Sequence, residues 1–465
     1  MAEHTDTERQ EAPDHRGPTR RRVLVAGALL VGSGGLGAVL SARRAERAEP
    51  TGPLPVLRAL PLRPDAHGVL AGLLTAAPAG ARLAYDGSVP GPVLRLREGQ
   101  RVRLGFRNAT DAHSSLHLHG LPIGPEVDRP LEHLLPGEQD LREFTLPPGS
   151  AGTAWYHPHA HGDVERQLLA GLAGPIVVAG PVDELPGLAE ADDQLVMIIR
   201  VGRDLVVNGA PHPLLTAATG RVRLRLLNAT AADVLRLAVH DFGDDAVELQ
   251  QIASDGGLLL RATPVHEVLL PPGGRAEVVV DADPDGPALQ RLRLTALPYS
   301  VNADGSGAGR ARTLLSLDLP AGPALPALPA RLGEVPALDA ATAVRTRRIV
   351  LDEGAGGGFT VDGRAFDQDR TDLTGRAGTL EIWDVVNAHT VDHPFHLHSH
   401  RVQVLDVDGR PPPHAAWLDT VNVRGGQTVR LAVALTGGIG RTVYHCHIAS
   451  HEDLGMVGVL DVRPA

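Results

Sequence analysis

The residues best suited to chemistry lie close together near the end of the chain. His445, Cys446 and His447 are consecutive, and Cys446 is the only cysteine. Side chains alternate between the two faces of an extended backbone, so Cys446 points one way and both histidines point the other, as in two metal sites placed back to back. A blue-copper centre combines two imidazoles and a thiolate with a weak axial thioether. His451 and Met456 would supply one imidazole and the thioether.

Further imidazoles are expected from three earlier histidine-rich segments. His396 and His398 share one face of a strand by the same period of two, which leaves His393 free to reach the blue-copper centre. One His-x-His pair is more often a coincidence than a ligand pair, but four pairs, one of them enclosing the only cysteine, are not reasonably four coincidences. Their eight imidazoles are enough for a cluster of three copper ions: His117 and His119, His157 and His159, His396 and His398, and His445 and His447.

In order and spacing, these segments resemble the four ligand segments of the multicopper oxidases, a family of laccases, bilirubin oxidases and bacterial cuprous oxidases. The resemblance implies four copper ions, classed as one type 1, one type 2 and a type 3 pair. It gives the type 1 copper the ligands His393, Cys446, His451 and Met456. It gives the type 2 copper His117 and His396. The type 3 pair receives the other six imidazoles: His119, His157, His159, His398, His445 and His447.

The resemblance also implies the reaction. A small reductant would lose one electron at a time at the type 1 copper, and dioxygen would take up four electrons at the trinuclear cluster to give water. Cys446 and its two histidine neighbours would connect the sites. Because water formation consumes protons, Asp128 and Glu452 are expected to act as catalytic acids, since both match acidic positions of the family. The alternative for each is a solvated surface charge.

The other histidines are less informative. His161 and His400 extend two of the ligand segments, and each is interpreted either as a hydrogen-bonding partner of a ligand or as an exposed loop residue. The ten that remain, which include His113, His133 and His389, form no site that the sequence identifies.

Internal repeats predict the fold. Short alternating runs with Gly and Pro between them favour an all-β chain of sandwiches or barrels. An alternating strand runs into an Asn-Ala turn three times, and a Gly-containing turn followed by another alternating strand also recurs three times. The strand-and-turn copies are residues 101–110, 221–230 and 380–388, and the Gly-containing turns are residues 135–138, 271–274 and 423–426. Together with the resemblance, this predicts three cupredoxin-like Greek-key β-sandwich or barrel domains.

The repeats also predict where the copper ions bind. Domain 1 (residues 51–180) and domain 3 (residues 336–465) contain the His-x-His pairs, whereas domain 2 (residues 181–335) contains no such pair. The eight imidazoles must therefore meet where domains 1 and 3 touch, with domain 2 as a spacer without copper ligands. Residues 179–193 are expected to link domains 1 and 2. Residues 319–340 either link domains 2 and 3 or form a covering loop.

The first 50 residues indicate export. Arg20, Arg21 and Arg22 precede an uncharged run that reaches Ala42, which resembles a signal read by the twin-arginine export machinery. The alternative is a permanent membrane anchor, because the run is nearly long enough to span a bilayer. The protein is thus expected to be extracellular, in the cell envelope or periplasmic. A formal net charge of -11 argues against a nucleic-acid partner.

The substrate remains open between two classes. Bacterial cuprous oxidases usually carry a Met-rich insert for Cu(I), whereas the methionines here are Met1, Met197 and Met456 only. The segments around Asp128 and Cys446 nevertheless look closest to that bacterial subgroup. The favoured prediction is oxidation of phenolic or other aromatic reductants, and the alternatives are oxidation of Cu(I) or another metal ion in copper tolerance, or a non-catalytic copper-binding envelope protein. A methionine as axial ligand predicts a low-to-middle type 1 potential.

Overall fold

The computed structural model describes residues 49–465 with the exception of 324 and 355. The predicted twin-arginine motif and the uncharged run after it lie outside the described residues. Within the described part of the chain, no helix has both the length and the apolar character needed to cross a membrane.

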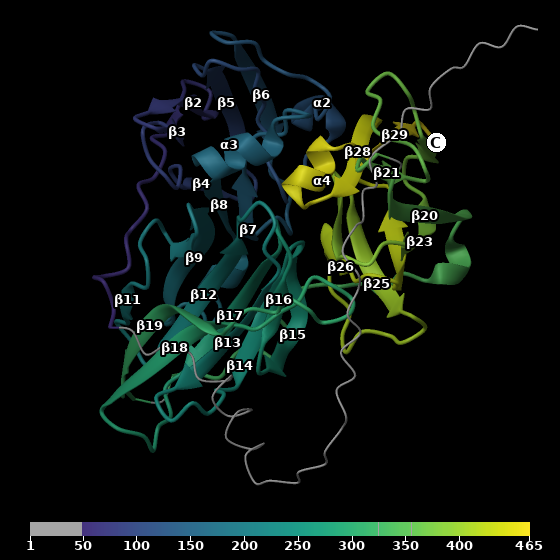
Figure 1. The fold of residues 1–465 in the computed structure, drawn as a ribbon. Coiled ribbons are helices and arrows are strands. Elements are labelled where there is room, and N and C mark those ends of the chain that lie inside the picture. Colours follow the sequence, from purple (N-terminus) through teal and green to yellow (C-terminus); the bar gives the residue numbers. More distant parts are fainter. Residues whose placement is uncertain (1–48, 324, 355) are drawn as a thin grey trace, which may run out of the picture. The chain divides into compact units, whose positions relative to one another are not determined.

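The described residues form six sheets, which build three cupredoxin-like sandwich domains (Figure 1). This confirms the predicted fold class. The helices of the described part are short: α2 (Pro125–Asp128), α3 (Val164–Ala170) and α4 (Ala449–Asp453), with the 3-10 turns η1 (Pro181–Glu184) and η2 (Ala340–Thr342).

The first sandwich has a five-stranded sheet, with the order β1-β2-β5-β6 and β3 beside β2, and a three-stranded sheet with the order β4-β8-β7. Its core contains residues of both sheets, such as Leu104 and Ile176. The strands are β1 (Arg63–Pro64), β2 (Leu70–Ala79), β3 (Arg82–Tyr85), β4 (Leu94–Arg97), β5 (Arg101–Asn108), β6 (Gln139–Thr145), β7 (Gly152–Tyr156) and β8 (Gly174–Ala179).

The second sandwich pairs a six-stranded sheet of order β10-β9-β12-β17-β14-β15 with a five-stranded sheet of order β11-β19-β18-β13-β16. The strands are β9 (Asp192–Val201), β10 (Asp204–Val207), β11 (Leu214–Thr216), β12 (Arg221–Asn228), β13 (Leu235–Asp241), β14 (Leu249–Ser254), β15 (Gly257–Val265), β16 (Val268–Leu270), β17 (Arg275–Asp281), β18 (Leu289–Leu297) and β19 (Arg312–Pro320).

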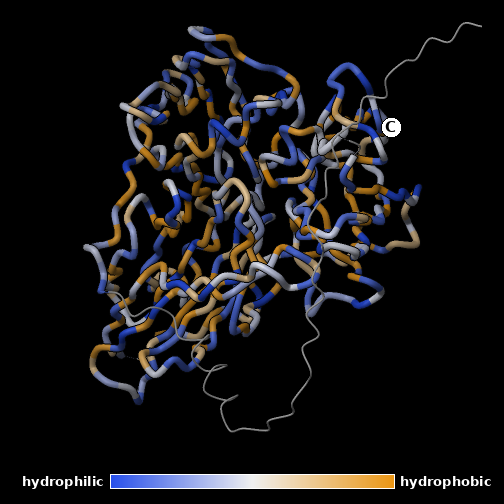
Figure 2. The backbone as a smooth tube through the Cα atoms, in the orientation of Figure 1, coloured by the Kyte–Doolittle hydropathy of each residue, from blue (hydrophilic) through white to orange (hydrophobic). Residues whose placement is uncertain are grey.

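The third sandwich has two five-stranded sheets, of orders β21-β20-β23-β27-β25 and β22-β29-β28-β24-β26. The strands are β20 (Arg345–Glu353), β21 (Phe359–Val361), β22 (Leu373–Arg376), β23 (Leu380–Asn387), β24 (His393–Leu397), β25 (Arg401–Val407), β26 (Thr420–Val423), β27 (Thr428–Ala434), β28 (Gly440–Cys446) and β29 (Val457–Arg463). Hydrophobic and hydrophilic residues are interleaved along the strands of the three domains (Figure 2), as expected for strands with one face in a core.

The repeated asparagine has the same structural role in all three domains. β5, β12 and β23 end at Asn108, Asn228 and Asn387, which are buried. The Asn228 side-chain amide donates to the carbonyls of Asp233 (2.7 Å) and Leu270 (2.9 Å). Leu270 ends β16 in the facing sheet, so the amide ties the two sheets together. Asn108 and Asn387 make the corresponding pairs of bonds, at 2.8 and 2.9 Å in each case.

Strand register places the chemistry of the third domain. β24 pairs with β28 so that His396 lies opposite His445 and Phe395 lies opposite Cys446. Side chains opposite each other in an antiparallel pair share a face. His396 and His445 therefore point to one side of the sheet, while Cys446 points to the other.

Helices α3 and α4 join the first and third domains, where the two helices lie side by side (Figure 1). The Asp453 carboxylate at the end of α4 accepts hydrogen bonds from the N–H groups of Val164 and Glu165, both at 2.9 Å, in the first turn of α3. A carboxylate at this end of a helix satisfies N–H groups that have no partner within the helix. This contact fixes the His445–His447 segment against the first domain.

Candidate metal centres

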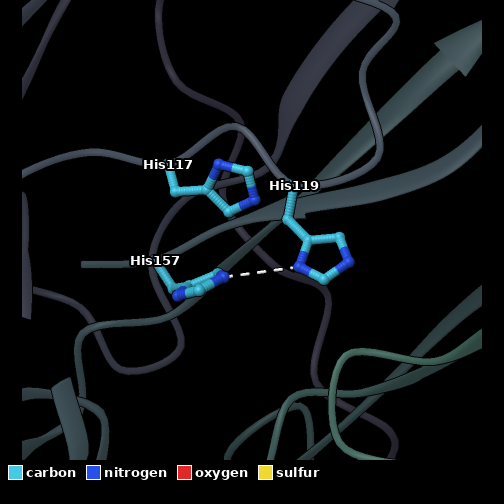
Figure 3. Close-up of side chains that lie close together, drawn as sticks. All are labelled: His117, His119 and His157. Atoms are coloured by element: carbon cyan, nitrogen blue, oxygen red, sulfur yellow. Dashed lines mark hydrogen bonds between the residues drawn. The ribbon is translucent and has the colours of Figure 1, made fainter. Parts of the chain in front are cut away.

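Eight histidines from the first and third domains converge in one buried group. None of them is more than 4% exposed, and neighbouring ring centroids lie between 3.9 and 5.8 Å apart. Figure 3 shows three of them, His117, His119 and His157, around a common space. The full group is His117, His119, His157, His159, His396, His398, His445 and His447.

Within this group, His159, His398 and His445 form a first trio. The Nε2 atom of His445 lies 3.0 Å from His398 Nε2 and 3.3 Å from His159 Nε2. The Nδ1 atom of His398 lies 2.7 Å from Asp128 Oδ2, and that of His445 lies 3.1 Å from Glu452 Oε2. A neutral ring that donates from Nδ1 presents only a lone pair at Nε2.

The second trio is His119, His157 and His447. His119 Nδ1 lies 3.2 Å from His447 Nε2 and 3.4 Å from His157 Nε2, the contact drawn in Figure 3. His157 Nδ1 is 2.9 Å from the Pro158 carbonyl, which accepts its proton and leaves the lone pair at Nε2. His119 has the opposite orientation, because its Nε2 faces Asp419 Oδ1 at 3.0 Å.

The two remaining imidazoles are His117 and His396, whose ring centroids are 5.6 Å apart. The Nδ1 atom of His117 lies 2.6 Å from Asp128 Oδ1, and that of His396 lies 2.8 Å from the Asp419 carbonyl. Both Nε2 atoms are buried without a hydrogen-bond partner among the described residues. Two oriented lone pairs without a partner are what a metal ion would occupy.

A separate cluster lies on the other side of β28. Cys446 Sγ is 3.5 Å from His393 Nδ1 and 3.7 Å from His451 Nδ1, and the two Nδ1 atoms are 3.1 Å apart. Met456 is fully buried in the same hydrophobic cluster as Cys446, and its carbonyl accepts the Cys446 N–H at 3.1 Å. Burial raises the pKa of the Cys446 thiol. A bound cation would therefore be needed to hold it as the thiolate.

Burial keeps most of the eight imidazoles neutral, which is the form in which histidine binds a metal ion. Burial lowers the pKa of seven of these rings well below the ordinary histidine value, and neighbouring rings lower it further. For His445, burial also lowers the pKa, but the Glu452 carboxylate outweighs it and the pKa is raised. His445 is thus the one ring of the eight whose protonation is favoured, by the Glu452 carboxylate at its Nδ1.

Copper fits these donor sets. The Nε2 atoms of His398 and His445 face each other at 3.0 Å, so one ion between them would contact both. Two imidazoles about 2.0 Å from one ion at a near-tetrahedral angle have nitrogens about 3.3 Å apart, close to the separations found here. Imidazole suits copper, and the His₂Cys set suits a blue-copper centre. The histidine clusters are consistent with a type 1 site and a trinuclear copper centre.

Both predicted acids lie inside the site. Asp128 is 2% and Glu452 is 3% exposed, so the alternative of a solvated surface charge is wrong for both. Asp128 bridges the rings of His117 and His398, one from each domain. Glu452 Oε1 lies 3.3 Å from His159 Nε2 without hydrogen-bond geometry, which leaves this oxygen unpaired among the described residues.

Domain 2 contributes more to the site than the sequence predicted. Arg275, at the start of β17, donates to both carboxylate oxygens of Asp419, at 2.8 and 2.6 Å. Asp419 in turn orients His119, so an arginine of domain 2 positions an imidazole of domain 1 through an acid of domain 3. At Gly273 (φ 83°), a Cβ atom would come within 2.8 Å of His447 Nε2. Sequence reasoning missed these residues because none of them belongs to a motif with metal-ligand spacing.

A small cavity of about 20 Å³ adjoins His117 and His396, enough for one or two water molecules. His400 and Asp128 also line it. His400 is 2% exposed and its Nδ1 accepts the Gly437 N–H at 2.9 Å. The interpretation of His400 as an exposed loop residue is therefore wrong; its ring bonds to none of the clustered imidazoles, while its backbone N–H donates to the His398 carbonyl at 2.7 Å. His161 is half-buried, and neither of its ring nitrogens has a hydrogen-bond partner in the described chain.

Comparisons with known proteins agree with this geometry. The multicopper oxidase family is matched at residues 74–183 and again at residues 336–465, which together make up just over half of the chain. The multicopper oxidase mco of Staphylococcus haemolyticus is 29% identical over 407 residues, which cover 82% of this chain and 83% of the relative.

Solved structures with the same fold include enzymes of both substrate classes. A multicopper oxidase from Campylobacter jejuni, described as a metallo-oxidase, is 25% identical with a TM-score of 0.78, over 90% of this chain and 96% of that one. A laccase from Pediococcus acidilactici is 26% identical with a TM-score of 0.77, over 90% and 95% of the two chains. The protein belongs to the multicopper oxidase family and is a copper-dependent oxidoreductase that uses oxygen.

Proposed function

We propose that this oxidase takes electrons from phenolic or other aromatic reductants, as a laccase does. The observation that carries the proposal is an aromatic face beside the type 1 cluster. The ring of Phe359 stacks on that of His451 with centroids 4.0 Å apart and an angle of 21° between the planes. Both side chains are partly exposed, so a planar reductant would reach an imidazole edge over an aromatic surface.

We further propose a division of the ligands among the four copper ions. Type 1 copper would be held by His393, Cys446, His451 and Met456, and type 2 copper by His117 and His396. The two trios, His159 with His398 and His445, and His119 with His157 and His447, would each hold one type 3 copper. When bound, the type 1 copper supplies one-electron oxidation of the reductant and the trinuclear coppers supply reduction of dioxygen.

The chain's own residues would supply protons and exclude water. Asp128 keeps His117 and His398 in the tautomer that presents Nε2, and it borders the small cavity from which solvent would reach the cluster. Glu452 has an oxygen that is free to hold a proton beside His159. Burial of all eight rings keeps bulk water from the reacting oxygen atoms.

One observation favours metal ions as the alternative substrate. His389 stacks on His393 with centroids 5.3 Å apart, and its Nε2 lies 3.3 Å from Glu353, which is exposed. A carboxylate and an imidazole beside the type 1 cluster are donors that a transition metal ion would accept. A cationic substrate would dock here and not on Phe359.

A substrate panel with two matched variants separates these classes. Copper-loaded protein would be assayed with a methoxyphenol and with Cu(I), Fe(II) and Mn(II), in wild type, Phe359→Leu and Glu353→Gln. We expect phenol oxidation to dominate and Phe359→Leu to raise the KM for phenol about fivefold or more, in line with roughly 1 kcal/mol from an aromatic contact. Metal-ion turnover that exceeds phenol turnover and falls only in Glu353→Gln would identify a metallo-oxidase instead.

We also propose that the chain is exported by the twin-arginine route, on the strength of Arg20, Arg21 and Arg22 and the uncharged run behind them. Lysine at all three positions should leave the oxidase inside the cell. Normal export of that variant would contradict the proposal, and wild-type oxidase retained in the membrane fraction would favour an anchor.

A further inference from the structure

A row of histidines leads from the trinuclear group toward the surface of domain 1. The ring of His161 lies 4.8 Å from that of His159, His133 lies 5.4 Å from His161, and His113 lies 5.3 Å from His133. The three rings beyond His159 come from three separate loops, before β6, before α3 and after β5. All three are only partly buried, whereas His159 is 1% exposed.

The spacing of this row is that of ligand rings in the same molecule. Ring centroids that face a common candidate metal position lie 5.2 Å apart for His398 and His445 and 4.9 Å apart for His393 and His451. The separations in the row, 5.3 and 5.4 Å, fall within the 5.0 to 5.6 Å found in the trio of His119, His157 and His447. Neighbouring rings of the row are therefore close enough for an ion to pass from one to the next.

The ring nitrogens of the row are free to bind. His133 Nε2 and both nitrogens of His161 are buried without a hydrogen-bond partner in the described part of the chain, since the nearby Pro130 carbonyl does not reach hydrogen-bond geometry with His161. Burial, assisted by His113, lowers the pKa of His133, so this ring is neutral at neutral pH. A neutral imidazole is the form that binds a metal ion.

Packing alone does not account for these rings. His161 lies 4.2 Å from the ring of Phe366 in domain 3, a contact that an apolar side chain would make equally well. Each buried nitrogen left without a partner destabilises the folded chain. A ligand that binds these nitrogens in passing would give them the partner that the protein does not supply.

We propose that His113, His133 and His161 form a loading path through which copper ions, as Cu(I), reach His159 and the trinuclear group. At each transfer, one copper–nitrogen bond to the outer ring breaks while one to the next ring forms, and no electron is exchanged. The path rests on the proposed assignment of His159 to a copper site. It requires a soft or borderline donor at position 133, and imidazole or thioether satisfies that requirement.

The test measures the rate at which copper enters the full-length protein. Metal-free chain would be mixed anaerobically with Cu(I), quenched with a chelator at intervals and analysed for total copper, while blue absorption after admission of oxygen reports the type 1 copper separately. The variants are His133→Leu, which removes the donor, and His133→Met, which keeps a similar size and supplies a thioether. His240→Ala, at a partly buried histidine of domain 2, is the control.

We expect His133→Leu to slow trinuclear loading about tenfold or more, with unchanged type 1 loading and the same final copper content. His133→Met should keep most of the wild-type rate. Wild-type loading in His133→Leu, equal slowing in both variants, or a lower final copper content would overturn the loading path. Failure of the oxidase proposal would look different, because fully loaded wild type would then consume no oxygen with a phenol.

Discussion

At the scale of single residues, carboxylates decide which nitrogen several of the clustered histidines present. Asp128 faces the Nδ1 atoms of both His117 and His398 at 2.6 and 2.7 Å, and so binds a ring of domain 1 to a ring of domain 3. A hydrogen bond to the distal nitrogen of a ligand fixes its tautomer and raises its basicity. Asp128 therefore positions one ring from each domain, and we propose that it also supplies protons to the cluster.

Replacing Asp128 with Asn tests this dual role. The amide keeps the shape but accepts fewer hydrogen bonds and carries no proton, so oxygen reduction should slow by about 10²-fold or more, while phenol still reduces the blue copper rapidly under anaerobic conditions. The control is Glu126→Gln, two residues away in α2 and exposed. Equal oxygen uptake in Asp128→Asn and wild type would show that the acid has no part in the reaction.

The convergence of the histidine clusters could be predicted from the sequence, because the period of two in a strand decides which of His445, Cys446 and His447 share a side. Asp419 and Arg275 could not be predicted. Each is a single charged residue in an ordinary strand pattern, and its role depends on three domains meeting at one point, which no local pattern encodes. The row formed by His113, His133 and His161 could not be predicted for the same reason.

At the scale of elements, the repeated Asn-ending strand explains how the same module can be used in all three domains. In domains 2 and 3 the asparagine ties the end of one strand to the facing sheet, in domain 1 it ties the strand end to the loop at Leu134, and in all three it holds the turn that follows. Domains 1 and 3 place ligand histidines after that turn, whereas domain 2 uses the same frame without ligands. The all-β class and the repeats were predictable from alternation and turn residues, but the contact between α3 and α4 was not, since these helices are too short to show a helical period.

Asn228→Ala should therefore destabilise domain 2 although it touches no ligand. The change removes the two hydrogen bonds that the amide donates to Asp233 and Leu270 and the two that its oxygen accepts from Thr230, which should lower the free energy of unfolding by roughly 2–4 kcal/mol. Urea unfolding of the metal-free chain measures this loss. The less buried Asn302 is the control position, and a loss no larger than that of Asn302→Ala would contradict the role assigned to the repeat.

At the scale of the whole molecule, the site exists only when all three domains are in place. Domains 1 and 3 supply the imidazoles, and domain 2 closes the group with Gly273 and Arg275. Arg275→Lys should release Asp419 from its bidentate contact and let His119 turn, because a lysine cannot reproduce the planar fork. We expect about 10- to 100-fold weaker copper retention in the trinuclear group, measured by chelator competition, with the blue absorption retained. Loss of the blue copper alone would refute this arrangement.

Acid should weaken the metal-free molecule as a whole. Burial holds the pKa of seven ligand histidines well below 6.5, and that of His400 at about 4. As pH falls below about 6.5, the unfolded chain therefore binds more protons than the folded chain. Each such ring lowers the free energy of unfolding by up to about 1.4 kcal/mol per pH unit. His445, whose pKa is raised, opposes this trend but is one ring against many.

Stability of the metal-free chain should thus be greatest above about pH 7 and fall steeply between about pH 6.5 and 4. Unfolding midpoints in urea across this range provide the measurement, and copper loading should move the loss to lower pH because the metal competes with protons for the same nitrogens. Stability that stays constant or rises on acidification would mean that the rings are solvated and the group is open.

The central claim is that one strand serves two copper centres, with Cys446 on one side and His445 and His447 on the other. Copper content and visible absorption of Cys446→Ser test it directly. Wild type should bind about four copper ions per chain and be blue, whereas the variant should be colourless, keep about three copper ions and no longer oxidise phenol. A variant that stays blue, or one that loses all of its copper, would contradict the account.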